Sequence, residues 1–105
     1  MHVVIFEVEP NAEGREEYLE IAATLRAELE TVEGFISIER FQSLVEPCKL
    51  LSLSTWRDEA AIKNWRDRAS HKTAQDKGRK SLFEHYRIRV ARVVRDYELD
   101  TSPWI

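Results

Sequence analysis

The segment from Val3 to Val8 constrains the fold most, because all but one of its side chains are apolar. Valine, isoleucine and phenylalanine favour strands. A strand that is apolar on both faces is usually buried on both faces. Pro10 follows the run and ends it. The sequence therefore predicts that this segment is a central strand of a sheet, and that both faces of that sheet are covered.

An amphipathic helix is predicted next. Apolar side chains recur there at three- and four-residue steps, opposite a charged face. The apolar stripe consists of Tyr18, Ile21, Ala22, Leu25, Leu29 and Val32. Asn11 is the expected N-cap, and Gly34 is expected to close the helix as a C′ glycine.

Two further strands are predicted at 35–41 and 50–56, where β-branched and aromatic residues are frequent. The connection 43–49 contains Pro47 and is typical of a hairpin loop. Asp58 then has the position of an N-cap for a second helical region. The apolar side of that region consists of Ala61, Ile62, Trp65 and Ala69.

The helical pattern continues beyond Ser70, which we expect to cap it. Its inner stripe consists of His71, Ala74, Gln75, Gly78 and Leu82. A last strand is predicted over 86–97, with a bulge near Ala91 and Arg92, where the alternation of side chains slips.

The resulting order, β-α-β-β-α-β, favours a ferredoxin-like α+β fold: a four-stranded antiparallel sheet with both helices on one face. One such domain fills residues 1–105. The opposite face would be left open, although the first strand is apolar on that side too. A homodimer with facing sheets, a dimeric α+β barrel, would cover it, and the last strand would extend to the partner.

Composition excludes several classes of function. The net charge of −3 argues against a nucleic-acid or anionic-membrane partner, and no apolar stretch is long enough to span a bilayer. Cys48 is the only cysteine, and His2, His71 and His85 are scattered, so no metal site is expected. The first residues do not have the pattern of a signal peptide, so a cytoplasmic location is expected.

The second half of the chain resembles the antibiotic-biosynthesis-monooxygenase (ABM) family. The resemblance rests on Leu51-Ser52-Leu53-Ser54-Thr55-Trp56, Ala61-Ile62-Lys63-Asn64-Trp65, the run from His71 to Arg79, and the run from Tyr86 to Tyr97. Glu33-Gly34-Phe35 also matches. The resemblance implies a dimer of ferredoxin-like protomers, each with a pocket between sheet and helices. Members include oxygenases that use neither metal nor flavin, and haem-degrading enzymes.

Six residues are candidates for the site. Trp65 matches the family's pocket tryptophan, and His71 matches a helical histidine suited to act as a general base. The expected substrate-binding residues are Trp56, Gln75, Gly78 and Tyr86. All but Gln75 have a structural alternative: Trp65 would suit the core, Trp56 and Tyr86 the core or an interface, His71 a helix cap, and Gly78 close packing of helix on sheet.

The resemblance implies a small monooxygenase that acts on a planar aromatic or quinol-type molecule without metal or flavin. Haem degradation is disfavoured as the cofactor alternative. The first strand has Glu7 in place of the family's asparagine, and Gln75 and Asp76 stand where a haem-ligating histidine is expected. Two alternatives remain: a non-catalytic dimeric module that binds a hydrophobic or aromatic small molecule, and a haem-binding or haem-degrading protein with non-standard ligands.

Overall fold

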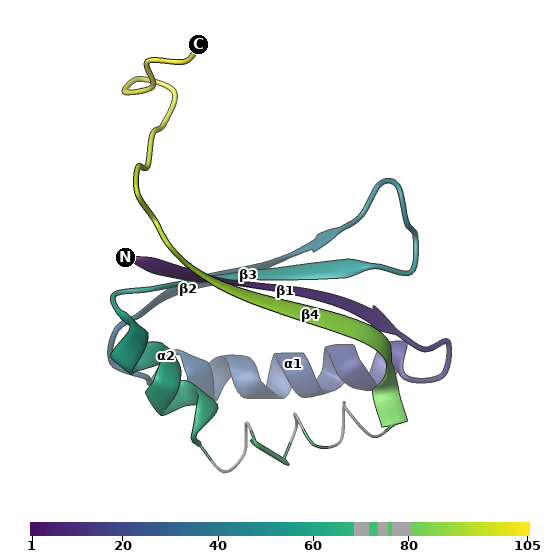
Figure 1. Ribbon diagram of the computed structural model, residues 1–105. Coiled ribbons are helices and arrows are strands. Elements are labelled where there is room, and N and C mark those ends of the chain that lie inside the picture. Colours follow the sequence, from purple (N-terminus) through teal and green to yellow (C-terminus); the bar gives the residue numbers. More distant parts are fainter. Residues whose placement is uncertain (69–71, 74–75, 77–80) are drawn as a thin grey trace.

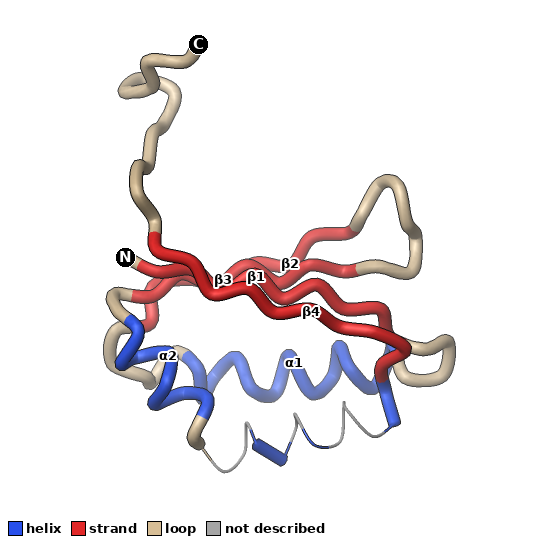
Figure 2. Tube along the Cα trace, in the orientation of Figure 1, coloured by secondary structure: helices blue, strands red, loops and turns tan. Residues whose placement is uncertain are grey.

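The fold is a four-stranded antiparallel sheet with two helices on one face (Figure 1, Figure 2). The computed structural model describes residues 1–68, 72–73, 76 and 81–105. The elements in chain order are β1 (His2–Pro10), α1 (Arg15–Leu29), β2 (Phe35–Gln42), β3 (Leu50–Trp56), α2 (Glu59–Arg66) and β4 (Phe83–Arg92). The strand order across the sheet is β2-β3-β1-β4. The predicted ferredoxin-like class and element order are therefore confirmed.

Strand β1 lies between β3 and β4, as its apolar character predicts. Val4 stands opposite Ser54 on β3 and Val90 on β4. Because side chains alternate along a strand, the even-numbered residues of β1 face the helices and the odd-numbered ones face away. One short segment therefore supplies both faces of the sheet.

Helix α2 begins where the sequence indicates. The extended Asp58 accepts a hydrogen bond at Oδ1 from the backbone N–H of Ala61, at 2.9 Å. This bond satisfies one of the free N–H groups at the start of the helix. Ala61 and Trp65 are buried on the inner side and Ile62 packs against them, so the predicted cap and the described part of the stripe are confirmed.

The predicted start of α1 is wrong. Its N-cap is Gly14, and no side chain caps it. Asn11 instead closes the preceding turn: its Oδ1 accepts from the N–H of Gly14 at 2.6 Å, and its Nδ2 donates to the carbonyl of Ser81 at 2.8 Å. Asparagine suits tight turns as well as caps, because its short side chain bonds nearby backbone in both.

The predicted end of α1 also needs correction. The helix stops at Leu29 with Glu30 as C-cap, so Val32 is buried outside the helix and Gly34 is not its C′ residue. Gly34 has φ +89°, and a Cβ there would lie 2.7 Å from the Cβ of Ala61. The glycine is required by a left-handed turn packed against α2, after α1 has already ended.

Strand β4 differs from the prediction at both ends, since it runs from Phe83 to Arg92. No bulge occurs near Ala91, which pairs regularly with Val3; the register of the β1–β4 pair shifts at Glu9/Pro10 instead. The alternation slips near Arg92 because the strand ends there. The residues that follow leave the sheet as an extended tail (Figure 1, yellow).

Several sequence predictions lie outside the described residues. These are the cap at Ser70 and the inner positions Ala69, His71, Ala74, Gln75 and Gly78. Leu82, the last residue of that predicted stripe, is described and is buried. In the described part of the chain, no helix has the length and apolarity needed to cross a membrane.

The core gathers at the end of the sheet where α2 packs. Its buried members are Leu29, Val32, Trp56, Ala61 and Trp65. Trp56 is 1% exposed, and its Nε1–H donates to Ser54 Oγ at 2.9 Å. A buried indole N–H needs such a partner. This part of the molecule is tightly packed, although the buried Nδ1 of His2, which stands opposite Trp56, has no hydrogen-bond partner among the described residues.

Candidate functional site

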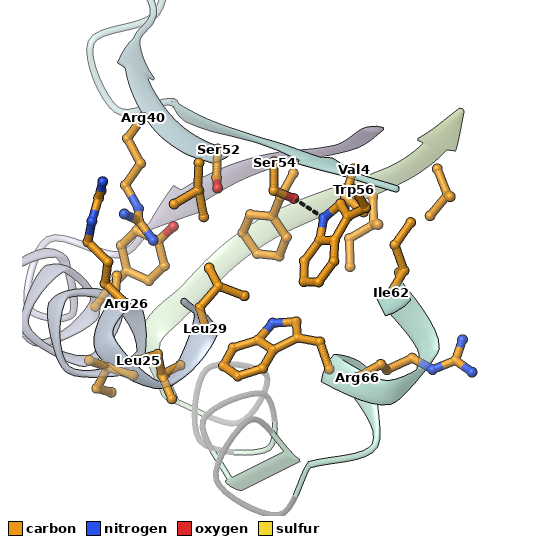
Figure 3. A pocket seen from close by; sticks show the side chains of 18 of the residues that line it. Val4, Leu25, Arg26, Leu29, Arg40, Ser52, Ser54, Trp56, Ile62 and Arg66 are labelled. Atoms are coloured by element: carbon orange, nitrogen blue, oxygen red, sulfur yellow. Dashed lines mark hydrogen bonds between the residues drawn. The ribbon is translucent and has the colours of Figure 1, made fainter. Parts of the chain in front are cut away.

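A cavity of about 400 Å³ lies between the sheet and α1 (Figure 3). This volume is within the usual range for sites that bind small molecules. Its walls are mainly apolar and include Val4, Phe6, Leu25, Leu29, Ile62 and Trp65. The even-numbered face of β1 and the apolar stripe of α1 therefore enclose a chamber as well as a core.

Two serines on β3 help to explain why the chamber is not filled. Ser52 and Ser54 point toward the helices, and both are buried, in a strand that otherwise carries Leu50 and Trp56 on that face. Small side chains at these central positions leave space that leucine would occupy. The sequence carries the signal as serines that share the parity of buried apolar residues. Sequence reasoning overlooked it.

Two of the predicted aromatic residues line the cavity. Trp65 is 8% exposed and belongs both to the wall and to the core cluster. Trp56 also lines the cavity, but it is fully packed within the wall and does not form a rim. The two interpretations of these tryptophans, core residue and ligand surface, are compatible.

Tyr86 lies beside the cavity, on the helix-facing side of β4 opposite Val8. Its ring stacks on Phe6 with a centroid distance of 5.9 Å and an interplanar angle of 8°. Phe6 itself lines the cavity, whereas Tyr86 is not among the lining residues. His71, Gln75 and Gly78 fall outside the described residues, so their roles stay predictions.

Three arginines border the cavity in different electrostatic settings. Arg26 lies 3.5 Å from Glu30, and Arg66 lies 3.7 Å from Asp67; both side chains are more than half exposed. Arg40 is half-buried, and no described residue accepts a hydrogen bond from its enclosed Nε. Leaving a buried donor unpaired costs about 1–3 kcal/mol. Sequence reasoning did not single out Arg40.

Charged residues at the ends of α2 stabilise the helix. The backbone N–H of Ala61 lowers the pKa of Asp58, and the side chain of Arg57 adds to this effect. At the other end, a hydrogen bond from Lys63 lowers the pKa of Asp67. These groups hold α2, and with it Trp65, against the sheet. Among the residues described, no cluster of histidine, cysteine and acidic side chains has the arrangement of a metal site.

Fold and cavity together define a ferredoxin-like domain with a ligand-sized apolar chamber between its sheet and its helices. The sequence model of the family "Antibiotic biosynthesis monooxygenase" matches residues 1–77. The chain belongs to this family.

One curated relative is 46% identical over 93 residues, which cover 89% of this chain. It is named "Jasmonate monooxygenase ABM" and comes from Pyricularia oryzae. The chain spans 43% of the length of that relative. The match therefore concerns one part of a longer protein.

Solved structures show the same fold at low sequence identity. A protein from Deinococcus radiodurans superposes with a TM-score of 0.83 at 12% identity, covering 94% of this chain and 98% of that one. A conserved protein from Methanosarcina mazei gives 0.78 at 22% identity, with 87% and 90% covered. Likeness at this level of identity concerns architecture only.

Proposed function

We propose that this chain is a monooxygenase that oxidises a planar aromatic or quinol-type molecule in the cavity between the sheet and α1, without metal or flavin. The observation that carries the proposal is the cavity itself: an apolar chamber of about 400 Å³, walled by Trp56 and Trp65, in a chain of a monooxygenase family. Indole rings offer flat apolar surfaces on which a planar ligand stacks.

A phenolic substrate supplies all the electrons that this reaction needs. Ring C–H and O–H bonds break, one oxygen atom of O₂ becomes a carbonyl oxygen, and the other leaves as water with the two hydrogens. The products are a quinone and water, so atoms and electrons balance without a further reductant. The chamber would exclude bulk water from the reactive anion. His71, outside the described residues, is proposed as the base that removes the phenolic proton.

Haem is the alternative cofactor, and the described residues do not fit it. Glu7, which stands where the haem-degrading relatives have an asparagine, faces away from the helices because it is odd-numbered on β1. Among the described residues that line the cavity, Tyr18 is the only one of a type that ligates haem iron. We therefore propose no step that involves haem.

Oxygen uptake tests the proposal. Naphthols and hydroquinones form the substrate panel, and jasmonate is added as a ligand for the binding measurement because of the relative's name. Uptake of one O₂ per substrate, lost in His71→Ala while binding persists, supports an enzyme. His85→Ala is the matched control, because His85 lies opposite Glu9 on the outward side of the sheet. Saturable binding with no oxygen uptake from any substrate would instead indicate a non-catalytic binding module.

We also propose that the chain forms a homodimer through the face of the sheet opposite the helices. That face carries the partly buried Val3, Ile5, Leu51 and Leu53 at its centre. Arg89 and Glu7 lie beside them, 3.7 Å apart. A second copy would cover the apolar centre in one twofold interface. Sedimentation velocity at micromolar concentration should give a dimer, and Leu53→Arg should give a monomer; a monomeric wild type would contradict the proposal.

A further inference from the structure

Two polar side chains of the cavity, those of Arg40 and Ser52, are neighbours on adjacent strands. Arg40 on β2 and Ser52 on β3 are paired across the two strands and both point inward. Figure 3 shows Arg40 and Arg26 at one end of the cavity, with Trp56 and Ile62 at the other. Arg66 also lines the cavity at the Trp56 end (Figure 3), but Asp67 lies 3.7 Å from it, so the arginine without a described carboxylate nearby is at the Arg40 end.

Arg40 differs from Arg26 and Arg66, the other arginines that line the cavity. Arg26 and Arg66 each have a carboxylate nearby, but no described residue accepts a hydrogen bond from the enclosed Nε of the half-buried Arg40. An enclosed donor without an acceptor is unfavourable unless something else satisfies it. A bound group with a negatively charged acceptor atom would accept the hydrogen bond from this Nε and balance the charge of the guanidinium.

We propose that the cavity binds an apolar molecule that carries one carboxylate, with the carboxylate on Arg40 and the apolar body toward the tryptophans. The planar guanidinium forms paired hydrogen bonds with a carboxylate, and Ser52 would add a hydroxyl donor.

This inference rests on the proposed function, because the ligand concerned is the substrate of that reaction. It adds an orientation in which the substrate binds. The carboxylate would fix which end of the substrate reaches Trp65 and would discriminate acids from neutral molecules of the same shape. Arg40 is thus proposed as a specificity-determining residue, whatever reaction follows binding.

Isothermal titration calorimetry of the full chain with 2-naphthoate and its neutral isostere 2-naphthamide tests the inference. The wild type should bind the acid more tightly. Arg40→Gln should weaken binding of the acid by roughly 10- to 100-fold, the usual worth of a charge-assisted hydrogen bond. Binding of the amide should change little, and Arg40→Lys should restore part of the affinity for the acid because it keeps the charge.

Arg15→Gln is the matched control, since it removes one positive charge close to Arg40. Arg15 donates to Gln42 at 3.0 Å and does not line the cavity. It should leave both affinities unchanged. Circular dichroism confirms that each variant is folded.

Three results would overturn the inference: equal affinity of the wild type for acid and amide, equal losses in Arg40→Gln and Arg15→Gln, or no binding of either compound at millimolar concentration. The titration requires no turnover. Binding of the acid through Arg40, with no oxygen uptake from any naphthol or hydroquinone, would therefore refute the monooxygenase but leave this inference standing. Oxygen uptake with a naphthol, together with binding of the acid that does not depend on Arg40, would support the monooxygenase and overturn this inference.

Discussion

The two ends of the cavity differ in how completely their side chains are buried and hydrogen-bonded. At the α2 end, Trp56, Ala61 and Trp65 are almost completely buried, and the polar atom of Trp56 is hydrogen-bonded. At the β2 end, the charged Arg40 lacks an acceptor for its Nε among the described residues. The first end contributes packing, and the second holds a half-buried arginine whose Nε has no described acceptor. We infer that stability is concentrated at one end of the chamber and ligand selection at the other.

The largest effect expected from this comparison is that of Trp56→Ala. Removing a fully buried indole should lower the free energy of unfolding by about 3–5 kcal/mol. Urea denaturation followed by far-ultraviolet circular dichroism measures the change. Trp104→Ala is the matched control, because Trp104 is 78% exposed and its loss should matter by less than about 0.5 kcal/mol. Similar losses in the two variants would contradict the assignment of the core to this end.

Gly34→Ala should have the next largest effect, again at the packed end. A non-glycine residue with positive φ costs about 1–3 kcal/mol. The new Cβ would also press against Ala61, at 2.7 Å. We expect a lower urea midpoint with an unchanged slope. Unchanged stability would show that this turn relaxes at no cost and that α2 is less tightly seated than its contacts indicate.

The cap of α2 should make stability at the packed end depend on pH. The pKa of Asp58 is lowered in the folded chain by the N–H of Ala61 and then by Arg57. The stabilisation is therefore present above the unfolded pKa, about 3.9, and is lost as the pH falls through the lower folded value.

Asp58→Asn keeps a capping side chain but does not titrate. Thermal unfolding followed between pH 2 and 6 should show a steeper loss in the wild type than in this variant. Parallel curves for the two proteins would mean that the ionised cap adds nothing to stability.

The smallest change in stability is expected at the Arg40 end, where a substitution should raise the free energy of unfolding instead of lowering it. Arg40→Leu removes a buried charge that lacks a described acceptor and should raise the free energy of unfolding by up to about 1 kcal/mol. Urea denaturation of the ligand-free chain measures it. A loss of more than about 1 kcal/mol would show that Arg40 is a structural residue, and the contrast between the two ends would fail.

The sequence predicted the packed end well and the polar end hardly at all. Trp65 could be predicted from the sequence because it follows Ile62 on a clear helical stripe after a recognisable cap at Asp58. Arg40 could not be predicted, because it stands beside Glu39 in a strand with charges on both faces. Only the pairing of Arg40 with Ser52 shows which of the two points inward. Strand register depends on contacts between distant segments, and local patterns do not contain it.

Errors at the ends of elements have a related cause. Asn11 and Gly34 were correctly recognised as special residues, but were assigned to the ends of α1 and not to the turns beyond them. The same side-chain chemistry serves a cap and a tight turn. What distinguishes them is a neighbour far away in the sequence: Ser81 for Asn11 and Ala61 for Gly34.

The three tryptophans give the protein an intrinsic fluorescence that reports on the cavity and on the tail. Trp56 and Trp65 are 1% and 8% exposed on the cavity wall, and Trp104 is 78% exposed on the tail. Their emission should separate into a blue-shifted component shielded from iodide and a red-shifted component that iodide quenches. In Trp104→Phe, the remaining fluorescence would come from the chamber alone. Ligand entry could then be followed in real time, without a label and without knowledge of the reaction.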